Sequence, residues 1–162
     1  MFKIETWVDN PILRKVADKV TDRGFKDAVK LGKEMIKYIK NPDNWWVWLA
    51  APQIWKSIKL VIVSMLKDRD DENFKTIMLI NPEILEYSKE TDIDTEWCLS
   101  VPWVKWEVER PTMIKLSYQD EKNTKKVLIL EWLQARIIQH ELDHIEWKLF
   151  VDYVKPKKTL IL

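Results

Sequence analysis

The two histidines of this chain stand four residues apart, and this spacing constrains the fold more than any other feature. His140, Glu141 and His144 form the pattern H-E-x-x-H in a 162-residue sequence that has no other histidine. Residues i and i+4 of an α-helix lie on one face, so both imidazoles can bind one metal ion while Glu141 points at its open position. The pattern predicts a helix that carries a catalytic metal site.

The residues before this pattern bear on whether the helix is buried, since H-E-x-x-H also arises by chance on solvated helices. Leu133, Ile137 and Ile138 form an apolar stripe at helical spacing. We therefore expect a helix from about residue 133 to 146 that packs against a core and gives the imidazoles a fixed, partly dry setting.

A third ligand is needed, because a catalytic zinc-like centre usually has three protein ligands and one position for water. The candidates are Cys98, which is the only cysteine, and an acidic residue; the ordinary alternative for Cys98 is a buried structural thiol. A metal held by Cys98, His140 and His144 would activate a water molecule, and Glu141 would take its proton and pass it to the departing amine. A lone cysteine and no signal peptide in residues 1–5 indicate a reducing cytoplasm.

Three segments together resemble the signature motifs of the peptide deformylases, G-x-G-L-A-A-P-Q, E-G-C-L-S and Q-H-E-x-D-H. This chain reads W-V-W-L-A-A-P-Q at residues 46–53, E-W-C-L-S at 96–100 and Q-H-E-L-D-H at 139–144, in the family's order. The resemblance runs from Asn10 to Asp152. It implies a single catalytic domain over residues 1–162 that removes the formyl group from the N-terminal formylmethionine of nascent chains and releases formate.

The resemblance also implies roles for residues outside the metal set. The side-chain amide of Gln53 and the backbone N–H of Leu99 would stabilise the oxyanion, although Gln53 could instead be a surface amide. Val47 and Trp48 would donate and accept main-chain hydrogen bonds with the extended peptide, and Trp46 would lie beside it. The family typically uses iron(II), and zinc, nickel or cobalt can occupy the same ligands.

Tryptophan stands where these motifs have glycine. Trp46, Trp48, Trp97 and Trp147 do so in or beside the motifs; Trp7, Trp55, Trp103 and Trp132 occupy other positions where the family commonly has glycine, and Trp45 and Trp106 lie in loop-like contexts. The chain has 2 glycines and 10 tryptophans, whereas average glycine usage is about 7%, or roughly eleven residues here. We infer that most of these tryptophans are glycines in the functional protein, through a UGA codon read as glycine in the source organism.

Real tryptophans would change the expected function. Glycine reaches positive φ and allows a close approach of backbone to ligand, and tryptophan does neither. With indoles in place, the chain could be a catalytically impaired, peptide-binding relative. A general H-E-x-x-H zinc protease is the other alternative, although such an enzyme has no need of Cys98.

Charge and hydropathy favour neither nucleic acid nor membrane as a partner. Lys and Arg total 27 against 26 Asp and Glu, the basic clusters are short, and no apolar run approaches the roughly 20 residues that span a bilayer. The expected partners are the formylated peptide and the ribosome.

The pattern of apolar residues predicts an α+β fold in which mixed or antiparallel strands enclose the late metal-binding helix. An amphipathic helix is expected over residues 25–40, and a hairpin turn over residues 120–123. The expected strands cover residues 58–65, 76–81, 83–87, 104–107, 112–118 and 125–130. Around the site, Asp143 is expected to support the helix, and Glu96 to form an ion pair with a cation such as Arg136.

Overall fold

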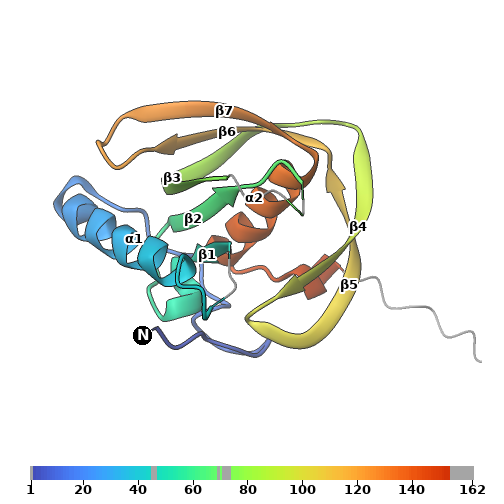
Figure 1. Cartoon of the computed structure of the whole chain (residues 1–162), viewed down its shortest axis with the longest axis horizontal. Coiled ribbons are helices and arrows are strands. Elements are labelled where there is room, and N and C mark those ends of the chain that lie inside the picture. Colours follow the sequence, from blue (N-terminus) through green and yellow to red (C-terminus); the bar gives the residue numbers. More distant parts are fainter. Residues whose placement is uncertain (1, 45–46, 69, 71–73, 154–162) are drawn as a thin grey trace, which may run out of the picture.

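The computed structural model describes residues 2–44, 47–68, 70 and 74–153, which form an α+β fold. Two α-helices, seven strands and three short 3₁₀ helices follow one another in the described residues (Figure 1). Their bounds are η1 Asp22–Gly24, α1 Phe25–Ile39, β1 Trp48–Ala50, η2 Ala51–Ile54, β2 Leu60–Met65, β3 Lys75–Tyr87, β4 Thr91–Cys98, β5 Val101–Pro111, β6 Met113–Gln119, β7 Lys125–Glu131, α2 Trp132–Ile145 and η3 Phe150–Tyr153.

Two antiparallel sheets enclose helix α2. The larger has the strand order β1-β2-β3-β6-β7, and the smaller is the β4–β5 hairpin. The chain leaves the larger sheet after β3, forms the hairpin and returns through β6 to pair with β3. Figure 1 shows α2 between the larger sheet and the hairpin. The expected α+β fold with strands around a late helix is thereby confirmed.

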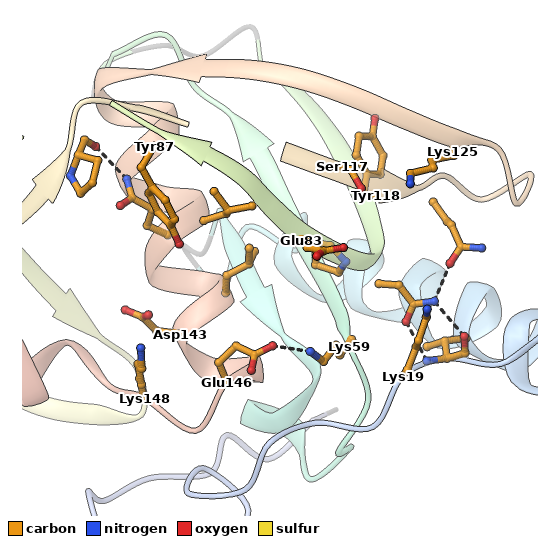
Figure 2. Close-up of a pocket in the computed structure, with 18 of the residues that line it drawn as sticks. Lys19, Lys59, Glu83, Tyr87, Ser117, Tyr118, Lys125, Asp143, Glu146 and Lys148 are labelled. Carbon is orange, nitrogen blue, oxygen red and sulfur yellow. Dashed lines mark hydrogen bonds and ion pairs between the residues drawn. The ribbon is translucent and has the colours of Figure 1, made fainter. Parts of the chain in front are cut away.

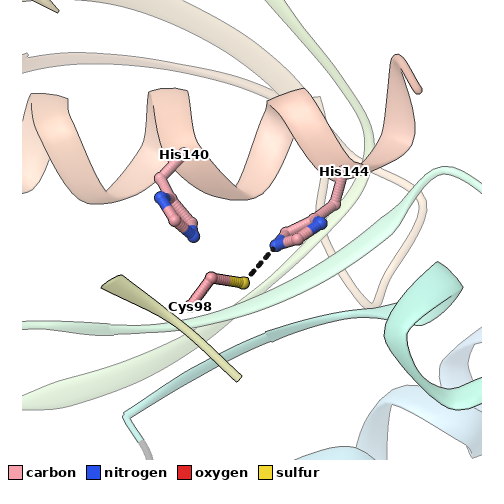
Figure 3. Close-up of side chains that lie close together, drawn as sticks. All are labelled: Cys98, His140 and His144. Carbon is pink, nitrogen blue, oxygen red and sulfur yellow. Dashed lines mark hydrogen bonds between the residues drawn. The ribbon is translucent and has the colours of Figure 1, made fainter. Parts of the chain in front are cut away.

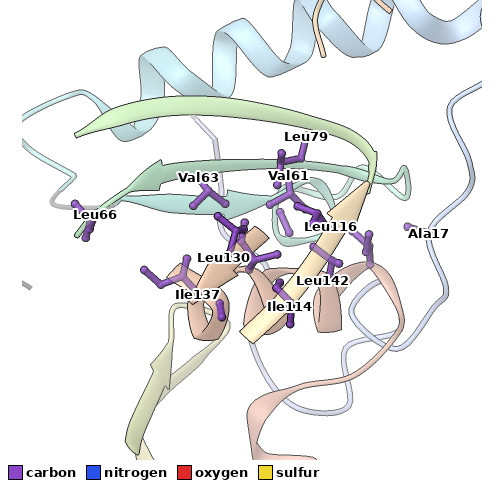
Figure 4. Close-up of a cluster of buried hydrophobic side chains, with 14 residues drawn as sticks. Ala17, Val61, Val63, Leu66, Leu79, Ile114, Leu116, Leu130, Ile137 and Leu142 are labelled. Carbon is purple, nitrogen blue, oxygen red and sulfur yellow. The ribbon is translucent and has the colours of Figure 1, made fainter. Parts of the chain in front are cut away.

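Strand β2 explains how the larger sheet holds a helix on each face. Its residues alternate in direction, as strand geometry requires. Val61 and Val63 face α2, where they pack with Ile138 and Leu142, and Figure 4 shows this cluster between the strands and the helix. Leu60 and Ile62 belong to the second cluster, which includes the buried side chains of α1. A strand buried on both faces appears in the sequence as an unbroken apolar run.

Both expected helices are confirmed within one residue at each end. Helix α1 buries Phe25, Met35 and Ile39. It also buries Gly32, where an added Cβ would come within 2.4 Å of the Met78 side chain. Gly32 thus allows α1 to lie close to β3, and a larger residue there would force Met78 to move.

The strands differ from expectation in four places. Residues 76–81 and 83–87 form one strand, because an irregularity in the β3–β6 register between Ile80 and Glu83 accommodates Pro82. Strand β4 was not predicted, since its alternating polar residues show no apolar face, and β1 was missed because it has three residues. Strand β5 is longer than the expected 104–107. The turn over residues 120–123 is confirmed by hydrogen bonds between Asp120 and Thr124.

Many of the tryptophans have a backbone conformation that favours glycine. In the described residues φ is positive at Trp7, Trp55, Trp103, Trp132 and Trp147, with values from 49° to 82°, and neither glycine has a positive φ. These five side chains are between 49% and 98% exposed, so burial of the indole does not compensate for the strained backbone. The conformations support the inference that glycine occupies these positions in the functional protein.

In the described part of the chain, neither α-helix has the length and apolar character needed to cross a membrane.

We predict that Trp103→Gly raises the free energy of unfolding by about 1 kcal/mol. Glycine adopts the left-handed backbone conformation without steric strain, and removal of this exposed indole sacrifices little packing. Trp103 has φ 69° and is 98% exposed. Trp106→Gly is the matched control: Trp106 lies on the same strand without a positive φ, so glycine there should lower the free energy of unfolding. Urea denaturation of the variants and the parent measures both effects. Equal destabilisation by the two substitutions would contradict the prediction.

Candidate active site

Cys98 lies against the two histidines of α2. The Cys98 Sγ and His144 Nε2 atoms are 3.2 Å apart, and one donor atom each from Cys98, His140 and His144 lie within 4.8 Å of one another. Figure 3 shows both rings pointing from the helix toward the thiol at the end of β4. The structure thus brings together three residues that lie up to 46 positions apart in the sequence.

The cluster is buried and favours the anionic sulfur. Cys98, His140 and His144 are 5%, 7% and 1% exposed. Burial raises the pKa of the Cys98 thiol, but the adjacent His144 and His140 outweigh this effect and hold the pKa well below its usual value. A thiolate is the form of cysteine that binds metal ions.

The donor set fits a divalent metal ion. His140 Nε2 is buried with no hydrogen-bond partner among the described residues, and buried polar atoms in proteins are rarely left unpartnered. Its other nitrogen, Nδ1, lies 2.9 Å from Glu96, the carboxylate–histidine arrangement that fixes the ring of a metal ligand. Phe150 also stacks on the His140 ring, with the centroids 6.0 Å apart. The unpartnered Nε2 atom of His140 therefore fits a metal ion.

Glu141 is wholly buried beside these residues. Its side chain is 0% exposed, and both carboxylate oxygens are without a hydrogen-bond partner in the described structure. Burial raises the pKa of Glu141 to about 7, against the lowering effect of the two histidines. A carboxyl group with a pKa near neutrality can both accept and donate a proton at physiological pH.

Glu96 takes part in four hydrogen bonds, two with β5 of its own hairpin and two with α2. Arg110 donates from Nε and Nη2 at 2.6 and 2.9 Å, Arg136 from Nη1 at 2.9 Å, and His140 Nδ1 lies at 2.9 Å. Burial raises the pKa of Glu96, but the bonds from Arg110 and His140 outweigh it and lower the pKa to about 2. The expected pairing of Glu96 with Arg136 is therefore present, and Asp143 supports the same cluster through Arg110.

Gln53 is a buried residue and not a surface amide. It is 2% exposed, and its Oε1 accepts a hydrogen bond from the Ala50 N–H at 2.9 Å. This bond turns Nε2 toward the metal cluster, where it lies 3.2 Å from Ser100 Oγ and 3.7 Å from Cys98 Sγ. The amide N–H groups thus face the thiol. Leu99 follows Cys98 in the turn between β4 and β5.

Strand β1 lies at the edge of the larger sheet and contacts α2. Ser64 N–H donates to the Val47 carbonyl at 2.7 Å, so this group of Val47 faces β2. Because successive residues alternate, the backbone groups of Trp48 face the opposite side, where β1 ends the sheet. Trp48 is therefore better placed than Val47 to pair with an added peptide strand. Trp46 lies outside the described residues.

A small hollow of about 40 Å³ lies next to His140. Its apolar lining residues are Leu133 and Ile137 of α2 together with Trp48 and Trp97. Typical small-ligand pockets have volumes of about 300 Å³ or more. Two indoles thus line the hollow at positions where the sequence motifs suggested glycine.

Sequence reasoning missed Arg110 and Phe150. Arg110 is 3% exposed on the inward side of β5. The period-two pattern that buries Val108 also buries Arg110, but a charged residue at that position is usually taken as solvent-facing. Phe150 carries no signal beyond its apolar character, and its contact with His140 depends on the fold of η3.

Comparison with known proteins identifies relatives over nearly the whole chain. A sequence model described as polypeptide deformylase matches residues 1–160. The peptide deformylase of Thermotoga petrophila is 37% identical, over 100% of this chain and 92% of the relative.

Solved structures of similar proteins have the same fold. The peptide deformylase of Thermotoga maritima is 34% identical with a TM-score of 0.78, over 96% of this chain and 99% of that one. A Met-Ala-Ser-bound class I type b peptide deformylase from Acinetobacter baumannii is 28% identical with a TM-score of 0.85, over 95% and 98% of the two chains.

We predict that Cys98→Ser lowers the affinity for Co(II) or Zn(II) by more than about 100-fold. A serine hydroxyl does not ionise as the thiol does. Loss of a ligand should also cost more metal affinity than loss of a residue that supports a ligand, which typically costs about 10–100-fold. Equilibrium dialysis with metal analysis measures the affinity. Ser100→Ala, which removes a hydroxyl from the same turn, should stay within a few-fold of the parent. Unchanged affinity in Cys98→Ser would contradict the prediction.

Proposed function

This chain belongs to the polypeptide deformylase family, and we propose that Cys98, His140 and His144 bind the metal ion on which its reaction depends. The family removes N-terminal formyl groups from nascent peptides and is metal-dependent. The observation that carries the proposal is the convergence of a buried thiol and two imidazoles beside a buried carboxylate without a partner among the described residues. The catalytic domain would cover residues 1–162.

Iron(II) is the metal that we propose, with zinc, nickel and cobalt as alternatives that the same ligands accept. A divalent ion at this position would act as a Lewis acid and lower the pKa of a water molecule toward neutrality.

Glu141 is the proposed general base and acid. Its carboxylate would take the proton of the attacking water as the oxygen bonds to the formyl carbon. When the C–N bond breaks, the same group would return the proton to the departing nitrogen, leaving formate and a free N-terminal amine. The pKa of about 7 suits both transfers.

Gln53 and Leu99 would stabilise the negative charge that develops on the formyl oxygen. The Gln53 amide nitrogen already faces the thiol, held by the bond from Ala50 to its oxygen. The Leu99 N–H follows the candidate ligand Cys98 directly in the chain. Donors fixed before the reaction need no reorganisation as the charge forms.

The substrate would bind as an extended strand along the free edge of β1. Trp48 would supply the main-chain hydrogen bonds, and Val47 and Trp46 are the further substrate-binding residues that we propose from the motif. The hollow beside His140, with its Leu133 and Ile137 walls, has the apolar character suited to a methionine side chain. The related Acinetobacter baumannii structure holds Met-Ala-Ser, a tripeptide that begins with methionine.

We further propose that the protein acts in the cytoplasm and meets its substrates at the ribosome. Formylated N-termini are carried by nascent chains, and a reducing compartment would preserve the Cys98 thiol. A general H-E-x-x-H protease, the alternative suggested by that motif alone, is not supported now that the family is known.

We expect Glu141→Gln to reduce formate release by about 10²–10⁴-fold while metal binding is retained, because the amide cannot transfer the proton. The assay uses a formyl-Met-Ala-Ser peptide and anaerobically prepared, iron-loaded protein, with metal content measured on the same sample. A variant that binds the metal fully and keeps the parent rate would refute the role of Glu141.

We expect Trp48→Gly combined with Trp97→Gly to lower the KM for the formylated peptide at least tenfold, because both indoles line the hollow beside His140. Trp103→Gly, whose side chain lies outside the hollow and is 98% exposed, is the control and should leave KM unchanged. If the KM of the double variant is no lower than that of the control, the site binds peptide equally well with tryptophan at positions 48 and 97. The inference that glycine is needed there for function would then be wrong.

A further inference from the structure

The ion cluster around Glu96 continues past Arg110 to two more residues. Arg110 Nη1 donates to Asp143 Oδ2 at 2.9 Å, and the Tyr153 hydroxyl donates to Asp143 Oδ1 at 2.9 Å. The Arg110 guanidinium also lies over the Tyr153 ring, 4.8 Å from its centroid. A continuous set of contacts thus runs from Tyr153 through Asp143, Arg110 and Glu96 to His140.

The outer end of this chain of contacts meets a groove on the other side of α2 from the candidate metal cluster. The groove has a volume of about 980 Å³, and Tyr153 and Asp143 are among its lining residues. Figure 2 shows Asp143 there, beneath Tyr87 and near Lys148. Tyr153 is 40% exposed, whereas Arg110 behind it is 3% exposed. Tyr153 therefore covers the buried guanidinium from the groove side.

Charge and geometry give Asp143 and Tyr153 different parts in fixing Arg110. Three N–H groups of Arg110 are divided between the two carboxylates, two to Glu96 and one to Asp143. If the Asp143 charge were removed, Arg110 would neutralise Glu96 more completely, and the carboxylate would accept the His140 proton less strongly. Tyr153 orients Asp143 through its hydroxyl and packs on the flat face of the guanidinium.

We propose that Tyr153 and Asp143 are positioning residues that act through Arg110 and Glu96 to set how strongly His140 binds a metal ion. This inference rests on the proposed role of His140 as a ligand. A carboxylate that accepts the Nδ1 proton of a ligating histidine raises its basicity, and loss of such support typically costs 10–100-fold in metal affinity. Asp143 lies two contacts beyond Glu96 and the Tyr153 hydroxyl three, so a smaller loss is expected from each, and the smaller of the two from Tyr153.

The test compares Tyr153→Phe, Asp143→Asn and the double variant in the 162-residue chain. Co(II) affinity is measured by titration, and the visible absorption of the bound ion reports its ligand geometry. We expect Asp143→Asn to lose about tenfold in affinity, and Tyr153→Phe to lose less. Because Tyr153 acts through Asp143, the double variant should lose no more than Asp143→Asn alone. The absorption spectrum should shift in each variant.

Tyr87→Phe is the matched control, since it removes a hydroxyl from the same groove and should leave affinity and spectrum unchanged. Thermal unfolding of the metal-free proteins separates positioning from general stability. If Tyr153→Phe and Asp143→Asn both keep the Co(II) affinity and spectrum of the parent, whatever their stability, this inference is overturned. The proposed ligand set is not affected by that outcome. Additive losses in the double variant would also overturn it. Failure of the parent to bind Co(II) would overturn the proposed ligand set as well.

Discussion

The active-site region depends on one buried carboxylate. Glu96 is 5% exposed, and Arg110, Arg136 and His140 share its four hydrogen bonds. Desolvating these charges is costly, and removing one partner from such a cluster typically destabilises a protein by about 3–5 kcal/mol, since the remaining charge stays buried. The groups come from β4, β5 and α2. Their mutual dependence therefore fixes the hairpin against the helix.

The same constraint places the thiol. Cys98 is two residues after Glu96 on β4, and residues i and i+2 of a strand lie on one face. Helix α2 shows the matching arrangement, because Arg136, His140 and His144 recur every four residues and share the face toward the hairpin. Its apolar residues, such as Ile138 and Ile145, pack on the larger sheet. Helix α2 thus has two faces, a polar face that carries the candidate metal ligands and an apolar face that packs on the larger sheet.

What could be predicted from sequence reflects which interactions are local. The helices were predicted well because their apolar spacing and breakers lie within one segment. The convergence of Cys98, His140 and His144 was predicted because three motifs resemble those of a known family. Strand β4 and residue Arg110 were missed for the opposite reason. Strand β4 has polar residues on both faces, such as Asp94 on one and Thr95 on the other, and it is stabilised by pairing with β5. Arg110 is buried only because Glu96 and Asp143 meet it from other elements.

Seven of the eight tryptophans in the described residues, all except Trp106, fall into two physical groups, and the two groups together argue for glycine more strongly than either does alone. At positions such as Trp103 and Trp132 the backbone itself takes the left-handed conformation, which disfavours any residue with a Cβ. At Trp48 and Trp97 φ is not positive, and what matters is the space that an indole occupies beside His140. One substitution pattern thus conflicts with two unrelated requirements, backbone geometry and room for a ligand. Glycine would satisfy both requirements, so the inferred reading of UGA as glycine would account for tryptophans in such different surroundings.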